Sequence, residues 1–131
     1  MVVLDTSAVL ASIDRREPHH QQVVDVMSSD LVMVMPIAIL SEVTFMIEQR
    51  LGPLQVARFL ASLVKGEISL YWDHGDLKRI LELLTRYQDM PLGFADAAVI
   101  ACAERHGGKV LTLDRRHFGV VEREGTIRVL P

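Results

Sequence analysis

Short apolar runs alternate along this chain with longer segments of helical periodicity, and this alternation limits the fold more than any other feature. The runs hold mostly hydrophobic residues in succession, which is typical of strands buried on both faces. Strands of this kind form parallel sheets that helices cover on both sides. We therefore predict an α/β fold with a central, mainly parallel sheet. The predicted strands are Val2–Leu4, 31–35, 68–72, 110–113 and 127–130.

Helical segments fill the spaces between these strands. Residues 6–13 follow the first strand, and Pro36 is tolerated in the first turn of the helix after the second. Residues 54–64 and 77–84 predict two amphipathic helices, and Gly107-Gly108 ends the helix before the fourth strand. The apolar positions at helical spacing are Leu54, Ala57, Leu60, Ala61 and Val64, and then Leu77, Ile80, Leu81 and Leu84.

Length and composition predict one domain over residues 1–131, because no repeat or long linker divides the chain. The longest uncharged apolar stretch, residues 31–41, is shorter than the ~20 residues of a membrane span. No basic or cleavable apolar segment precedes the first strand, so we expect a cytoplasmic protein. The single cysteine, Cys102, lies in an alanine-rich run and is expected to be a small buried filler.

Four acidic residues occupy positions that the fold would gather. Asp5 ends the first strand and Asp114 the fourth, and parallel strands bring their carboxyl ends to one edge of the sheet. Glu42 lies within an apolar helical pattern that would turn its carboxylate inward. Asp96 opens a helix whose apolar face includes Val99, so its charge needs a positive neighbour.

Each carboxylate also has an ordinary explanation, and for Asp5 and Asp114 it is helix capping. One metal site nevertheless explains all four placements together. Oxygen ligands select hard cations, so we expect Mg²⁺, with Mn²⁺ able to substitute. The five histidines lack the spacing of a zinc site and are interpreted as solvated or capping residues. A carboxylate cluster with such a cation suits phosphodiester hydrolysis by water that the metal activates.

Bulk charge does not predict a nucleic-acid partner, because the formal net charge is −3. Two local arginine pairs flank the acidic positions. Arg15-Arg16 and Arg115-Arg116 are therefore candidate RNA contacts, with solvated surface as the alternative for all four.

Four segments together resemble a PIN-domain ribonuclease, specifically a VapC-type toxin. They are Val3 to Leu10, Ser41-Glu42-Val43, Gly93 to Ala97, and Leu111 to Asp114. The resemblance implies a three-layer α/β/α fold and Mg²⁺-dependent endonucleolytic cleavage of RNA that leaves a 5'-phosphate and a 3'-hydroxyl. It also implies a homodimer and a small cognate antitoxin.

The resemblance assigns Asp5, Glu42, Asp96 and Asp114 to the catalytic, metal-binding cluster. Thr6, Ser7 and Thr112 are its expected hydrogen-bonding support. Direct metal contact is expected for Asp5 and Asp96, with Glu42 and Asp114 acting through waters. Asp89 competes with Asp114 for the last acidic position.

Two other classes of function stay open at this point. One is a catalytically silent module that binds RNA or a partner protein. The other is a receiver domain or aspartyl phosphatase, although that class needs a second acidic residue beside Asp5, where Thr6-Ser7 supply none.

Two partner surfaces are also predicted. Residues 37–47 are hydrophobic nearly all round, so we expect them to lie at a homodimer interface. An antitoxin is expected to lay an apolar segment beside residues 37–47 and 54–64. It would place an arginine or lysine near Asp5, Glu42 and Asp96.

Overall fold

A five-stranded parallel sheet forms the centre of the computed structural model, which describes residues 1–29 and 32–131. The strand order is β3-β2-β1-β4-β5, and all four pairings are parallel, which confirms the predicted α/β class. Leu31, the predicted start of the second strand, lies outside the described residues. The strands are β1 (Val2–Leu4), β2 (Met33–Pro36), β3 (Ser69–Tyr71), β4 (Lys109–Leu111) and β5 (Arg128–Leu130).

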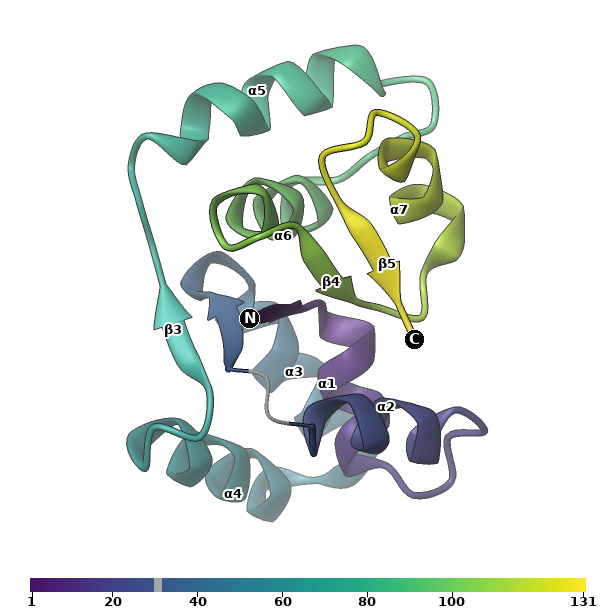
Figure 1. Ribbon diagram of the computed structural model, residues 1–131. Coiled ribbons are helices and arrows are strands. Elements are labelled where there is room, and N and C mark those ends of the chain that lie inside the picture. Colours follow the sequence, from purple (N-terminus) through teal and green to yellow (C-terminus); the bar gives the residue numbers. More distant parts are fainter. Residues whose placement is uncertain (30–31) are drawn as a thin grey trace.

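Helices form a layer on each side of this sheet (Figure 1). One layer holds α1 (Thr6–Ile13), α2 (His20–Met27), α3 (Leu40–Leu51) and α4 (Pro53–Val64). The 3₁₀ turn η1 (Ile37–Ile39) leads from β2 into α3 and contacts both α3 and α6. The other layer holds α5 (Asp76–Arg86), α6 (Phe94–Arg105) and α7 (Arg115–Glu122). This is the three-layer α/β/α arrangement that the resemblance implied.

The core fills both faces of the sheet, and the alanine-rich helix α6 is its most completely buried helix. Residues 97–103 of α6 are all buried, and the helix contacts β1, β2 and β4. Small side chains let α6 approach the sheet closely, and Cys102 is a buried filler as predicted. Gly107 and Gly108 follow the helix with φ of 92° and 88°, conformations that favour glycine. In the described residues, no helix is both long and apolar enough to cross a membrane.

Two helices depart from the sequence prediction. The first is α2, which begins at His20 in a segment where no helix was predicted. This helix buries only Val23, so its polar sequence carries little periodic signal. The second is the eight-residue helix α7, which was not among the predicted helices and which Asp114 caps. Burial of Phe118 and Val121 stabilises the second turn of α7.

The helix α4 exists as predicted, but its periodic apolar residues face outward. Its buried residue is Phe59, whereas Leu54 and Val64 are 62% and 88% exposed. Apolar residues lie on both sides of this helix, so periodicity alone did not decide which side packs inward. The exposed residues Leu54, Ala57, Leu60, Ala61 and Val64 form one surface, here called the α4 stripe.

Candidate active site at the carboxyl ends of β1 and β4

A cavity of about 480 Å³ opens beyond the carboxyl ends of β1 and β4. The chain builds the sheet outward from β1 to β3 and then returns to place β4 on the other side of β1. Connections on the two sides of this point lead to opposite faces, which leaves a crevice where open parallel sheets bind ligands. Six acidic residues line the cavity, namely Asp5, Asp14, Glu17, Glu42, Asp96 and Asp114.

Asp5 is held at the floor of this cavity by two hydroxyl groups. Its side chain is buried, with the residue 5% exposed. Ser7 Oγ and Thr112 Oγ1 both donate to Asp5 Oδ2, at 3.0 and 2.7 Å. The two hydroxyls in turn accept the backbone N–H groups of Leu113 and Asp114, each at 3.0 Å. The carboxylate is therefore fixed in orientation by contacts to both strand ends.

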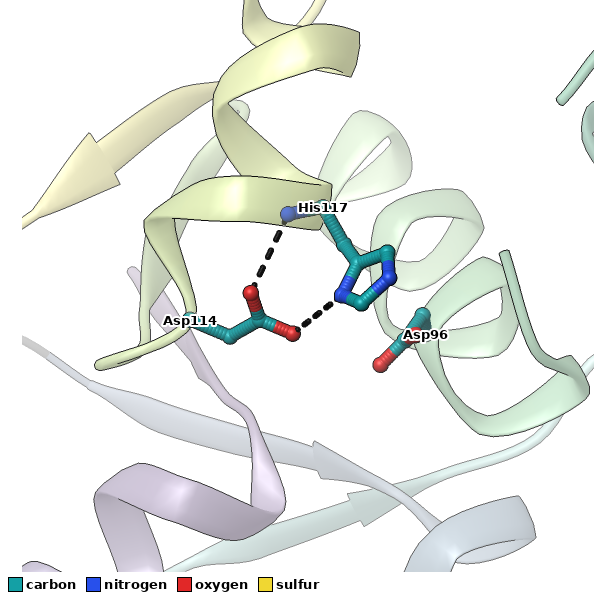
Figure 2. A group of neighbouring side chains, drawn as sticks. All are labelled: Asp96, Asp114 and His117. Carbon is teal, nitrogen blue, oxygen red and sulfur yellow. Dashed lines mark hydrogen bonds and ion pairs between the residues drawn. The ribbon is translucent and has the colours of Figure 1, made fainter. Parts of the chain in front are cut away.

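Asp96, Asp114 and His117 form the tightest group of metal-ligating side chains in the described part of the chain. One ligand atom from each lies within 4.8 Å of the other two. Asp96 comes from the first turn of α6, Asp114 caps α7, and His117 follows on its first turn. Figure 2 shows the imidazole beside both carboxylates, with its Nδ1 turned toward Asp114.

The carboxylates of the cavity are not easily all ionised at once, because burial and mutual repulsion disfavour their charged forms. The pKa of Asp96 is raised to about 6. Burial is the largest cause, and the negative charges of Asp5 and Asp114 act in the same direction. Burial also raises the pKa of Asp5, although the hydrogen bonds from Thr112 and Ser7 oppose this shift. The positive neighbour expected for Asp96 is not a lysine or arginine, since neither type forms an ion pair with it in residues 1–29 and 32–131.

Glu42 also lines the cavity, and its exposure corrects one prediction. Its residue is exposed at the surface of α3, whereas the sequence pattern had turned it inward. Thr6 Oγ1 donates a hydrogen bond of 2.7 Å to Glu42 Oε2. This bond ties the first turn of α3 to the first residue of α1 and holds the carboxylate at the cavity. Glu42 is exposed because its side of α3 faces the open cavity and not the sheet.

Comparison with known proteins identifies the family. The PIN domain family matches residues 2–124 of the chain. This chain is a PIN domain. Ribonuclease VapC26 of Mycobacterium tuberculosis is 33% identical over 128 residues, which cover 95% of this chain and 94% of the relative. The chain therefore belongs to the VapC-type branch of the PIN domain family, and a receiver domain is set aside.

Solved structures share the fold at lower identity. VapC20 of Mycobacterium tuberculosis, described as a toxin that cleaves the sarcin-ricin loop, matches with a TM-score of 0.82 and 19% identity over 100% of both chains. DNA-bound VapBC of Salmonella typhimurium matches with a TM-score of 0.71 and 20% identity over 98% of this chain and 95% of the other. FitAcB of Neisseria gonorrhoeae gives a TM-score of 0.69 at 18% identity, over 100% of this PIN domain and 97% of its own chain.

The remaining candidate residues lie outside the centre of the cavity. Asp89 is exposed in the turn after α5 and does not belong to the cavity lining of the described residues, whereas Asp114 does. Arg15 and Arg16 are exposed after α1, and Arg16 pairs with Asp14 at 3.1 Å. Arg115 and Arg116 are exposed on α7, and Arg115 donates to the backbone oxygen of Pro131.

Two residues of the site were missed from the sequence. His117 was interpreted as solvated or capping, but its ring contacts Asp114. Arg50 lines the cavity and lies two helical turns after Glu42 on α3. Arg50 could have been found because it lies eight residues after Glu42, a spacing that puts both on one side of the helix. His117 could have been found because a residue three positions after an N-cap lies close to the capping side chain.

The donor set of this PIN domain fits a divalent cation. Asp5, Asp96 and Asp114 line one cavity and couple electrostatically, so a cation there would relieve their repulsion. Carboxylate oxygens are the ligands that Mg²⁺ and Mn²⁺ prefer. Asp5 lines the same cavity as Asp96 and Asp114, and its charge raises the pKa of Asp96.

Proposed function

We propose that this protein is a metal-dependent endoribonuclease and the toxin of a VapBC-type toxin–antitoxin pair. The observation that carries the proposal is the convergence of Asp5, Asp96 and Asp114 in a cavity at the switch point of a PIN fold. The 33% identity to a protein named ribonuclease VapC26 supports RNA as the substrate. Mg²⁺ is the expected cofactor, with Mn²⁺ able to substitute.

The chain's own residues would hold and orient the reacting groups. Asp5 and Asp96 are proposed to contact the cation directly, and Thr112 and Ser7 keep Asp5 aimed at it. Glu42, held by Thr6, is proposed to act through water in the same cavity. When bound, a divalent cation activates water for attack on phosphorus and neutralises charge on the phosphate oxygens. No side chain then needs to act as a nucleophile, and the products carry a 5'-phosphate and a 3'-hydroxyl.

A cleavage assay with the full chain tests this proposal. We expect an RNA labelled at its 5' end to be cut when Mg²⁺ or Mn²⁺ is present and to survive when EDTA is added. The downstream cleavage fragment should be joined by a ligase that requires a 5'-phosphate, which would confirm the predicted end. Retained RNA binding without cleavage under any divalent ion would favour the alternative, a catalytically silent module that binds RNA or a partner.

The antitoxin is proposed to bind across α4. The α4 stripe is an exposed apolar surface on a helix that packs against α3, and α3 carries Glu42 into the cavity. Relatives of known structure include DNA-bound VapBC of Salmonella typhimurium and a toxin–antitoxin complex from Klebsiella pneumoniae. An apolar antitoxin segment would cover the stripe, and a cationic side chain beyond it would reach the carboxylates.

Co-expression with the cognate antitoxin tests this surface. Leu60→Asp should weaken the complex, because it places a charge at the centre of the α4 stripe. Lys78→Asp, an exposed change on α5, is the matched control and should leave the complex intact. Equal affinity of the two variants for the antitoxin would show that α4 is not the contact.

A further inference from the structure

A second hollow, of about 270 Å³, lies beside the acidic cavity. His19 and Leu113 line both spaces, so the two share one wall. The second hollow differs in charge, because no carboxylate side chain of the described residues lines it. We propose that this hollow, here called the Arg115 subsite, binds the nucleotide next to the cleaved bond. Its lining consists of His19, Gln22, Thr112, Leu113, Arg115 and Pro131.

Thr112 places the Arg115 subsite next to the proposed metal site. This buried residue lines the hollow, and its hydroxyl donates to Asp5 Oδ2 at 2.7 Å. One side chain therefore separates a group in the hollow from a carboxylate that we propose to contact the cation. A nucleotide that adjoins the scissile phosphate has to bind within such a short distance of the metal. The inference thus rests on the proposed nuclease function and deepens it.

Arg115 supplies the positive charge of the subsite. Its side chain donates to the backbone oxygen of Pro131, which holds the guanidinium at the hollow. In residues 1–29 and 32–131, no carboxylate side chain forms an ion pair with Arg115. A guanidinium has five N–H donors, so others stay available for a phosphate. Arg115 therefore suits a phosphate of the RNA strand.

Gln22 and His19 supply groups that suit a base. Both are exposed at the start of α2, where His19 is the N-cap. The amide of Gln22 offers donors and an acceptor to a base edge, and an imidazole can stack on a base. The start of α2 is fixed, because His20 Nδ1 donates to the carbonyl of Ala11 at 2.6 Å. The subsite therefore combines a phosphate contact with groups that can select the base.

RNA binding in EDTA tests the phosphate contact, because it requires neither metal nor cleavage. The probe is a short, fluorescein-labelled, single-stranded RNA of randomised sequence. Arg115→Gln should lower the affinity by about three- to tenfold and reduce the slope of log Kd against log salt by about 0.7. Arg115→Lys keeps the charge and should recover part of the affinity. Arg123→Gln, an exposed change at the end of α7, is the control and should bind like wild type.

Cleavage of a randomised RNA pool tests base recognition. Sequencing of the cut ends gives the base preference at each position around the cut. Gln22→Ala should weaken the preference at one position beside the cut by about two- to tenfold, as expected for one hydrogen bond. Gln21→Ala is the matched control, because Gln21 bonds to Asp25 on α2 and does not line the subsite.

Two outcomes would overturn the inference. One is an Arg115→Gln variant that binds the RNA as tightly as Arg123→Gln. The other is a Gln22→Ala variant that cuts with the base preference of wild type. Failure of the nuclease proposal is separate, because RNA binding in EDTA would still depend on Arg115 while no divalent ion supports cleavage. In that case a photocrosslink from 4-thiouridine RNA should still map to the start of α2, and a crosslink elsewhere only would refute the subsite.

Discussion

Thr112 Oγ1 donates a hydrogen bond of 2.7 Å to Asp5 Oδ2 across a sequence separation of 107 residues. The same hydroxyl accepts the backbone N–H of Asp114, so one buried side chain connects the ends of β1 and β4. This connection depends on the parallel register that pairs Leu4 with Leu111. A shift of one residue would turn Thr112 to the other face of the sheet and leave Asp5 without this donor.

Asp5→Asn and Asp96→Asn are each expected to abolish metal-dependent RNA cleavage, with a loss of at least about 100-fold. An amide preserves the shape of the side chain but removes the charge that would hold a cation. Cleavage rates with saturating Mg²⁺ measure the effect, and circular dichroism checks the fold. Asp89→Asn is the matched control, because Asp89 is an exposed carboxylate outside the cavity lining. Undiminished cleavage by either cavity variant would refute the assignment.

Thr112→Val is expected to destabilise the protein by about 1 to 3 kcal/mol, since it removes a donor to Asp5 and leaves the Asp114 N–H without its acceptor. Thr112→Ser retains the hydroxyl and should recover most of that loss. Urea unfolding at pH 7.5 measures both variants. A valine variant as stable as the serine variant would contradict a role for the hydroxyl in stability.

The stability of the metal-free protein should depend on the ionisation of Asp96. Its pKa is raised from 3.8 to about 6, so between these values the folded state binds more protons than the unfolded state. This contribution is therefore fully present below pH 4 and is lost as pH rises through 6. Asp96→Asn should remove this pH-dependent contribution. Above pH 7 the free energy of unfolding of the variant should exceed that of wild type by about 1 to 2 kcal/mol, a figure discounted for partial exposure.

The difference between the two proteins is the quantity to measure, because other carboxylates titrate in both. Asp14 and Glu124, for example, have lowered pKa values and give the opposite trend. Urea unfolding of both proteins in EDTA from pH 4 to pH 8 gives this difference. A difference that does not change over this range would show that Asp96 titrates normally.

Phe45→Asp is expected to shift the protein toward monomer. Phe45 and Ile37 are 61% and 45% exposed, and both belong to the segment 37–47 that we propose as the homodimer interface. Light scattering at micromolar concentration would measure the oligomeric state. Leu81→Asp, which changes a similarly exposed apolar residue on α5, is the control and should leave the dimer intact. A monomeric wild-type protein would rule out the interface.

Arg50→Gln is expected to raise KM for RNA by about tenfold, with a smaller change in kcat. Arg50 is the arginine that lines the acidic cavity, where it can contact a phosphate beyond the scissile bond. The salt dependence of KM should also become shallower. Arg123→Gln, an exposed change at the far end of α7, is the control. Equal KM values for the two variants would exclude Arg50 from substrate binding.

The sequence by itself determined the sheet and the carboxylates that meet at its edge. Continuous apolar runs predict buried parallel strands wherever they occur, and Asp5 and Asp114 follow two of those runs. Strand direction then brings such residues together, whatever lies between them in the chain. The family motifs strengthened the same assignment, because they coincide with the strand ends and the helix that carries Asp96.

Only the tertiary structure decided which side of each helix is covered and which side chains reach one another. Glu42 is exposed at a cavity and not buried, and the α4 stripe faces outward although its spacing is that of a packed face. His117 joins the acidic group because α7 begins at Asp114 and turns the ring toward it. A periodic pattern specifies a helix and its faces, but the neighbour that packs against a face comes from distant parts of the chain.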